Sequence, residues 1–173
     1  MIKFSLLDHL RGARASSDLG DTETVVRIVK ELDKLEPERA RYLAAFAYVL
    51  SRVAGADRHV SDDETAAMVS VVERIGKLPR AQSMLVVEIA KTQNRLFAGT
   101  EDFLVTREFS AIASDAQRRE MLDCLFAIAQ ADRMVSAEED VEMRQIANQL
   151  GFSHAEYIAA RLAHGVTRTS RLE

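Results

Sequence analysis

Apolar residues recur along this chain three and four positions apart, and they show no convincing two-residue alternation of the kind expected for a strand. Two sets illustrate the spacing most clearly: Met68, Val71, Val72 and Ile75, and then Met143, Ile146, Ala147 and Leu150. Each set marks one buried face of a helix. The pattern therefore predicts an all-α protein.

The same periodicity, read together with prolines, glycines and capping residues, predicts about eight or nine helices of ordinary length. In chain order they are Phe4 to Leu10, Val25 to Leu32, Pro37 to Ala54, Ser61 to Gly76, Pro79 toward Leu96, Phe103 to Ala113, Ser114 through Ile128, Ser136 to Gly151, and Ser153 through Leu162. Residues 1–20 hold the first helix and a small, polar linker from Gly12 to Gly20.

One phrase occurs twice in the chain. Residues 56–64 have the pattern A-D-R-x-V-S-x-x-E, and residues 131–139 repeat it. The match extends outward at a constant offset, so that Leu50 corresponds to Leu125 and Gly76 to Gly151. We therefore predict an internal duplication, with units of about 40–76 and 115–151. Each unit is a helix, an acidic loop, a second helix and a glycine stop. Two copies favour a pseudo-twofold globule over a solenoid.

Composition limits the protein class without identifying a function. A length of 173 residues suits one compact domain, residues 1–173, with a sizeable core. The net charge of −4 and the lack of a Lys/Arg stripe argue against nucleic acid as a partner. The longest apolar run, Leu43 to Leu50, is too short for membrane insertion, and no secretory signal is visible. A single cysteine, Cys124, excludes a disulfide within the chain and fits a cytoplasmic location.

The two acidic loops have a structural interpretation. Ser61 with Glu64, and Ser136 with Glu139, form the S-x-x-E pattern of a capping box at a helix start. Ser153 begins a third such pattern, without an aspartate four residues earlier. The S-x-x-E part of the repeated motif is therefore a general signal for the start of a helix in this chain. What distinguishes the two loops is the Ala-Asp-Arg upstream of each serine.

The alternative interpretation is a divalent-cation site. Asp57 and Glu64, with Asp132 and Glu139, would supply carboxylate oxygens of the kind that hard cations prefer. The loops are not EF-hands, because the sixth position, which requires glycine, is Asp62 in the first copy. Both interpretations remain open on the residues alone.

No enzymatic constellation is visible. The four histidines share no metal-ligand spacing, and Cys124 lies on an apolar helix face, where an inert core thiol is expected. The chain has neither a Ser/His/Asp or Cys/His arrangement nor a glycine-rich phosphate loop. We therefore expect a protein that is not an enzyme.

The doubled helix–loop–helix unit resembles the tellurite-resistance TerB-like family, which includes the N-terminal domain of DjlA-type co-chaperones. The second copy carries the resemblance in three segments, 125–132, 135–139 and 146–153, and the likeness spans about Ala40 to Leu162. The resemblance implies an all-helical fold, a link to bacterial stress and tellurite resistance, and divalent-cation binding. If the acidic positions of the family are mapped onto this sequence, the resemblance implies that the ligands are Asp57 and Glu64 with Asp132 and Glu139.

One departure from the family pattern bears on that expectation. The family usually has glycine after the aspartate, whereas this chain has Arg58 and Arg133. Two functions are therefore expected. The first is a non-enzymatic, cytoplasmic stress-response protein that binds a divalent cation such as Ca²⁺, Mg²⁺ or Zn²⁺. The second is a metal-free, co-chaperone-type interaction module in which the arginines pair with the carboxylates. In either case the expected partners are other proteins.

Overall fold

The computed structural model describes residues 19–54, 61–96, 102–131 and 135–166. Within these ranges it has eight helices and no strand, which confirms the predicted all-α class. The helices are α2 (Leu19–Leu32), α3 (Pro37–Ala54), α4 (Asp62–Arg74), α5 (Arg80–Leu96), α6 (Asp102–Ile112), α7 (Asp115–Ala131), α8 (Ala137–Gln149) and α9 (His154–Ala163).

The predicted helices correspond one to one with the observed ones, apart from Phe4 to Leu10, which lies outside the described residues. One boundary differs slightly: the sequence predicts a linker up to Gly20, whereas α2 begins at Leu19. A first helical turn tolerates small polar residues because its N–H groups have no partner within the helix. The pseudo-twofold relation between the two units stays a prediction.

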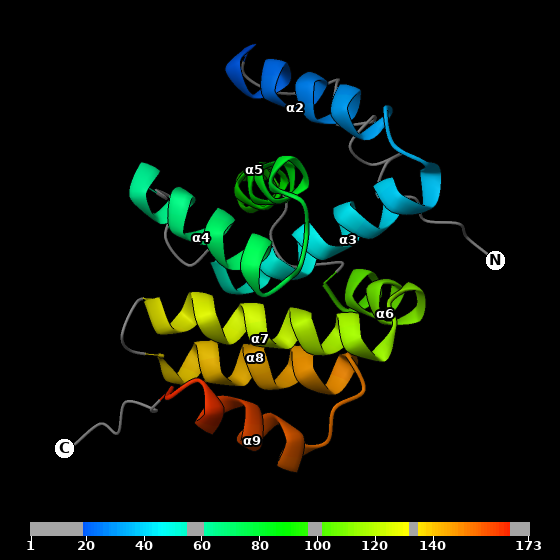
Figure 1. The fold of residues 1–173 in the computed structure, drawn as a ribbon. Coiled ribbons are helices and arrows are strands. Elements are labelled where there is room, and N and C mark those ends of the chain that lie inside the picture. Colours follow the sequence, from blue (N-terminus) through cyan, green and yellow to red (C-terminus); the bar gives the residue numbers. More distant parts are fainter. Residues whose placement is uncertain (1–18, 55–60, 97–101, 132–134, 167–173) are drawn as a thin grey trace.

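Helix α3 is the centre of the fold. Every residue from 42 to 50 is buried, and the helix contacts α5, α6, α7 and α8. A helix that is apolar all round must be surrounded by others, which explains this position. Figure 1 shows α7, α8 and α9 stacked below it, α4 beside it, α5 above it, and α2 outermost at the top.

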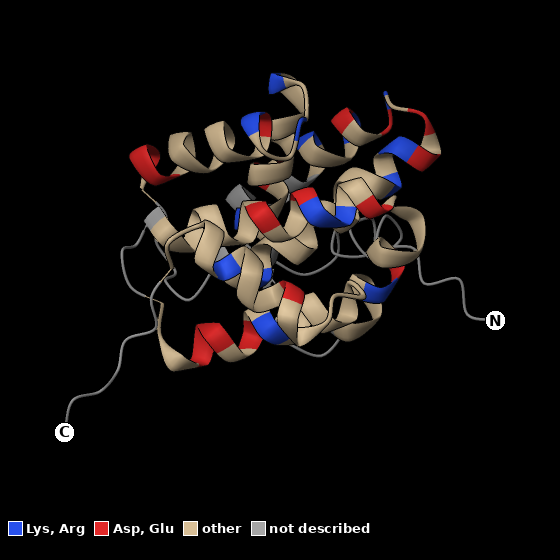
Figure 2. Ribbon diagram, turned by 60° about the horizontal axis from the view of Figure 1, so that its bottom comes forward, with Lys and Arg blue, Asp and Glu red and all other residues tan. Residues whose placement is uncertain are grey.

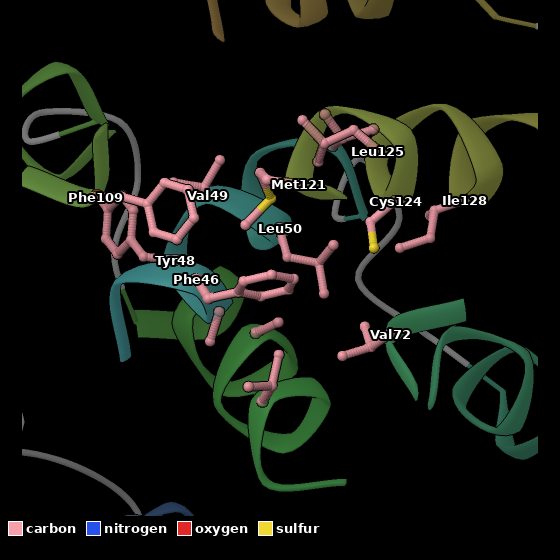
Figure 3. Packing of buried hydrophobic residues seen from close by; sticks show 14 of the residues in the cluster. Phe46, Tyr48, Val49, Leu50, Val72, Phe109, Met121, Cys124, Leu125 and Ile128 are labelled. Atoms are coloured by element: carbon pink, nitrogen blue, oxygen red, sulfur yellow. The ribbon is translucent and has the colours of Figure 1, made fainter. Parts of the chain in front are cut away.

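Aromatic contacts tie α3 to α6 in the core. Phe46 lies 5.9 Å from Phe109 in an edge-on arrangement, and the ring of Tyr42 lies 5.6 Å from that of Phe109. Figure 3 shows Phe46 and Leu50 facing Met121 of α7. This packing holds α3 against α7, and these are the helices that lead into the two acidic loops.

The two glycine stops work differently. Gly151 has a φ of 90° and completes a Schellman motif, in which the N–H of Phe152 donates to the carbonyl of Ala147 at 2.9 Å. Gly76 does not take the left-handed conformation; its neighbour Lys77 does, with a φ of 52°. Gly76 is needed for space instead, since a Cβ there would lie 2.7 Å from the carbonyl oxygen of Val72.

Candidate functional site

The acidic loops lead into helices α4 and α8 through complete capping boxes, as predicted. In α4 the N–H of Ser61 donates to Glu64 Oε2 at 2.6 Å, and the N–H of Glu64 donates to Ser61 Oγ at 3.2 Å. In α8 the corresponding distances between Ser136 and Glu139 are 2.8 and 3.1 Å. The two helix starts therefore have the same local construction.

A third box, at the start of α9, provides an internal comparison. The N–H of Ser153 donates to Glu156 Oε2 at 2.8 Å, with no acidic loop before it. In this box the hydroxyl of Ser153 and its backbone N–H both lower the pKa of the Glu156 carboxyl. The backbone N–H of Ser61, followed by its hydroxyl, likewise lowers the pKa of Glu64. The cap therefore forms without an upstream aspartate.

The predicted cation ligands divide into two groups. Asp57 and Asp132 lie outside the described residues. Glu64 is exposed and Glu139 half-exposed, and each uses Oε2 in its cap, so that Oε1 takes no part in the capping box. In Figures 1 and 2 the first turns of α4 and α8 lie on the same side of the molecule but apart, with the end of α7 between them.

The described ranges hold no group of three or more His, Cys, Asp or Glu side chains that could bind a metal ion. A cation site would therefore depend on the aspartates of the loops. The four-residue site stays a prediction.

A buried carboxylate, missed as a site by sequence reasoning, joins α8 to α9. Asp140 is 2% exposed, and its Oδ1 accepts a hydrogen bond from the Tyr157 hydroxyl at 2.8 Å. Arg161 Nη1 approaches the same oxygen at 3.1 Å, and Arg144 Nη2 contacts Oδ2 at 2.6 Å. Burial raises the pKa of Asp140, but the hydrogen bonds from Tyr157, Arg144 and Arg161 outweigh it and hold the pKa below its ordinary value.

Of these contacts, the sequence indicates only the pairing of Asp140 with Arg144. Asp140 and Arg144 stand four residues apart, as an ordinary surface ion pair on a helix would. What removes Asp140 from solvent is the docking of α9, whose Tyr157 is 1% exposed. That contact is tertiary, so the helical spacing of α8 could not reveal it.

A second buried charge, Arg52, connects α3 to α6 and α8. Its side chain is 4% exposed; Nε donates to Glu142 Oε1, and Nη1 donates to Thr106 Oγ1 and Gln149 Oε1, each at 2.7 Å. The four groups satisfy one another across three helices. Their role is to fix α8 against the centre of the fold.

Two other candidates among the described residues, Cys124 and His164, have structural roles in this fold. Cys124 is fully buried, and burial raises the pKa of its thiol to about 12, which leaves it protonated and unreactive near neutral pH. His164 Nε2 lies 3.1 Å from Asp123 Oδ1, and its ring stacks on Phe126 at 5.8 Å between centroids. These contacts attach the end of α9 to α7.

The three serine caps give a direct stability test. Replacing Ser61, Ser136 or Ser153 with alanine removes the hydroxyl acceptor, so each change should lower the free energy of unfolding by about 1 kcal/mol. Chemical denaturation of the three variants measures this. Ser70→Ala is the control, because Ser70 is exposed within α4 and serves no cap. A loss as large in Ser70→Ala would contradict the assignment.

No helix in the described residues is both long enough and apolar enough to cross a membrane.

A family model described as Tellurite resistance protein TerB matches residues 42–162, which begin within α3 and end within α9. No curated protein and no solved structure matches the chain. The match includes both acidic loops and both helices that follow them.

Proposed function

We propose a function from the premise that this chain belongs to the tellurite-resistance TerB family, whose model matches well over half of its length, residues 42–162. The protein acts in the cytoplasm of a bacterium as a non-enzymatic component of a stress response. It works by binding, with a divalent cation held at the acidic loops and other proteins as its partners.

One observation carries the cation proposal. The twin capping boxes place Glu64 and Glu139 at equivalent positions directly after the two loops, and each cap engages only Oε2 of its glutamate. Oε1 of each glutamate is then available to a cation whose other ligands come from Asp57 or Asp132 and from loop carbonyls. Hard cations such as Ca²⁺ and Mg²⁺ take oxygen ligands of this kind.

A second candidate is a metal-free adaptor of the co-chaperone type. The cap at Ser153 supports it, because an equivalent box forms there with no aspartate upstream. In this alternative Arg58 and Arg133 neutralise the neighbouring aspartates, and the loops serve only to start α4 and α8.

Calorimetric titration separates the two candidates. Chelator-treated protein is titrated with Ca²⁺, Mg²⁺, Mn²⁺ and Zn²⁺, alongside the double variant Asp57→Asn/Asp132→Asn. The cation proposal expects saturable binding that the double variant loses. A matched control, Glu38→Gln/Asp115→Asn, removes the same charge from the first turns of α3 and α7 and should still bind.

The metal-free candidate expects a different result. No cation binds at millimolar concentration, and Asp57→Asn/Asp132→Asn lowers thermal stability equally with and without chelator. That result would refute cation binding while leaving the family assignment intact.

A further inference from the structure

Three helices line a recess in the upper half of the molecule as it is drawn in Figure 1. Helices α2 and α4 both pack on α5, and a space of about 580 Å³ remains where the three meet. Clefts of this size commonly hold small organic ligands. The described residues that line it belong neither to the capping boxes nor to the buried charge clusters of α8, so its chemistry has to be considered separately.

The walls of the recess carry one net positive charge. Two cations line it, Arg27 of α2 and Lys91 of α5, and Glu88 is the one carboxylate among the described lining residues. Arg27 and Glu88 form an ion pair and neutralise each other, which leaves the charge of Lys91. The acids in the first turn of α4, residues 62–64, do not line the recess.

The Lys91 ammonium keeps hydrogen-bonding capacity that the described residues do not use. An ammonium group has three N–H donors, and Lys91 Nζ donates to the Thr65 hydroxyl at 2.8 Å. That hydroxyl donates to the carbonyl of Ser61, also at 2.8 Å, so towards Lys91 it acts as the acceptor. Within the described ranges no carboxylate pairs with Lys91, although its side chain is half-buried. A cation held only by a neutral hydroxyl is suited to bind an anion.

The recess also has an apolar wall. Val69 of α4 and Met84 of α5 line it, and Met84 is 55% exposed. A ligand that covers this apolar surface removes it from water, which favours binding. The recess therefore combines a cation and a hydroxyl with apolar surface, and this combination suits a carboxylate that carries an apolar group.

We propose that the recess between α2, α4 and α5 binds a small organic monocarboxylate with a short aliphatic or aromatic body. The carboxylate accepts hydrogen bonds from Lys91 Nζ, and the body covers Val69 and Met84. A single negative charge balances the single net positive charge of the walls. A doubly charged phosphate ester would leave an excess negative charge beside Glu88.

Titration followed in ¹H–¹⁵N spectra of the full chain tests this proposal, with hexanoate as the probe. The expected result is saturable binding with a dissociation constant of about 1 mM or lower, and with shifts at the amides of Thr65, Val69 and Lys91. Acetate lacks the apolar body and 1-hexanol lacks the charge, so each should bind at least about fivefold more weakly.

Three variants locate the site. Lys91→Met keeps the length of the side chain and should weaken hexanoate binding about tenfold, the loss of one hydrogen bond to a charged group, while Lys91→Arg should stay within about threefold of wild type. Lys34→Met removes the same charge from an exposed lysine outside the recess and should bind as wild type does. The spectra show directly whether each variant is folded.

A fourth variant does not depend on Lys91. Met84→Gln replaces an exposed side chain, so the core stays intact, and it should weaken hexanoate severalfold without changing acetate. The proposal is overturned if hexanoate does not saturate the wild type, or if 1-hexanol binds as tightly as hexanoate. It is also overturned if Lys91→Met and Lys34→Met bind equally, or if Met84→Gln has no effect.

Discussion

Replacing Asp140 with alanine should lower the free energy of unfolding by about 3–5 kcal/mol, because a buried charge pair loses one partner and leaves the other uncompensated. Asp140 is 2% exposed, and Arg161, whose Nε is buried without a hydrogen-bond partner, would lose its nearest carboxylate. The Tyr157 hydroxyl would also lose its 2.8 Å carboxylate acceptor and keep only the backbone carbonyl of residue 140, at 3.3 Å. Urea denaturation gives the measurement, with an unchanged dependence on urea concentration showing that the same folded state is compared.

Two further variants sharpen this result. Glu138→Gln is the matched control, because Glu138 is an exposed acid in the same first turn of α8. This substitution should change the free energy of unfolding by less than about 0.5 kcal/mol. Asp140→Asn keeps an acceptor for Tyr157 but no charge. Its free energy of unfolding should therefore fall by an amount between those of Glu138→Gln and Asp140→Ala. Equal effects of Glu138→Gln and Asp140→Ala would mean that the helix dipole, and not the buried cluster, accounts for the stabilisation.

The same carboxylate predicts a dependence of stability on pH. Its folded pKa lies below the ordinary value of 3.8, so its contribution is fully present above that value. As pH falls through the lowered folded pKa, the contribution disappears. Between pH 5 and strongly acidic conditions, the wild type should therefore lose more stability than Asp140→Asn does.

Replacing Phe46 with alanine should lower the free energy of unfolding by about 3–5 kcal/mol, because the surrounding side chains cannot fill the cavity that the ring leaves. Phe46 is fully buried, contacts the rings of Tyr42 and Phe109, and lies beside Gly76. For a protein of this size the melting temperature should fall by roughly 10 °C. Calorimetric melting measures the change.

Phe103 is the matched control for that substitution. It is 52% exposed and contacts the Arg107 guanidinium over its ring, so Phe103→Ala should cost no more than about 1 kcal/mol. Similar losses in the two variants would contradict the placement of Phe46 at the centre of the core.

The helices were predictable from the sequence because each is recorded locally. The S-x-x-E boxes indicate where a helix begins, and the periodic apolar residues indicate which face it buries. The boxes at Ser61, Ser136 and Ser153 are formed as predicted. Ser114 with Gln117 caps α7 in the same way.

What the sequence could not reveal depends on contacts between distant helices. Asp140 has the local pattern of an exposed first-turn acid, and only the docking of α9 buries it. Arg52 occupies the last turn of α3, where a base favours the helix dipole, yet its partners lie on α6 and α8. The role of Gly76 likewise depends on Val72 and Phe46, not on a left-handed φ.

Paramagnetic broadening by Mn²⁺ tests most directly the claim that the acidic loops are more than helix caps. In ¹H–¹⁵N spectra recorded at substoichiometric Mn²⁺, amides at Ser61–Glu64 and Ser136–Glu139 should broaden, while those at Ser153–Glu156 should not. Asp57→Asn/Asp132→Asn should abolish the effect. Equal broadening at all three helix starts, or at none, would contradict the account and leave the loops as structural caps.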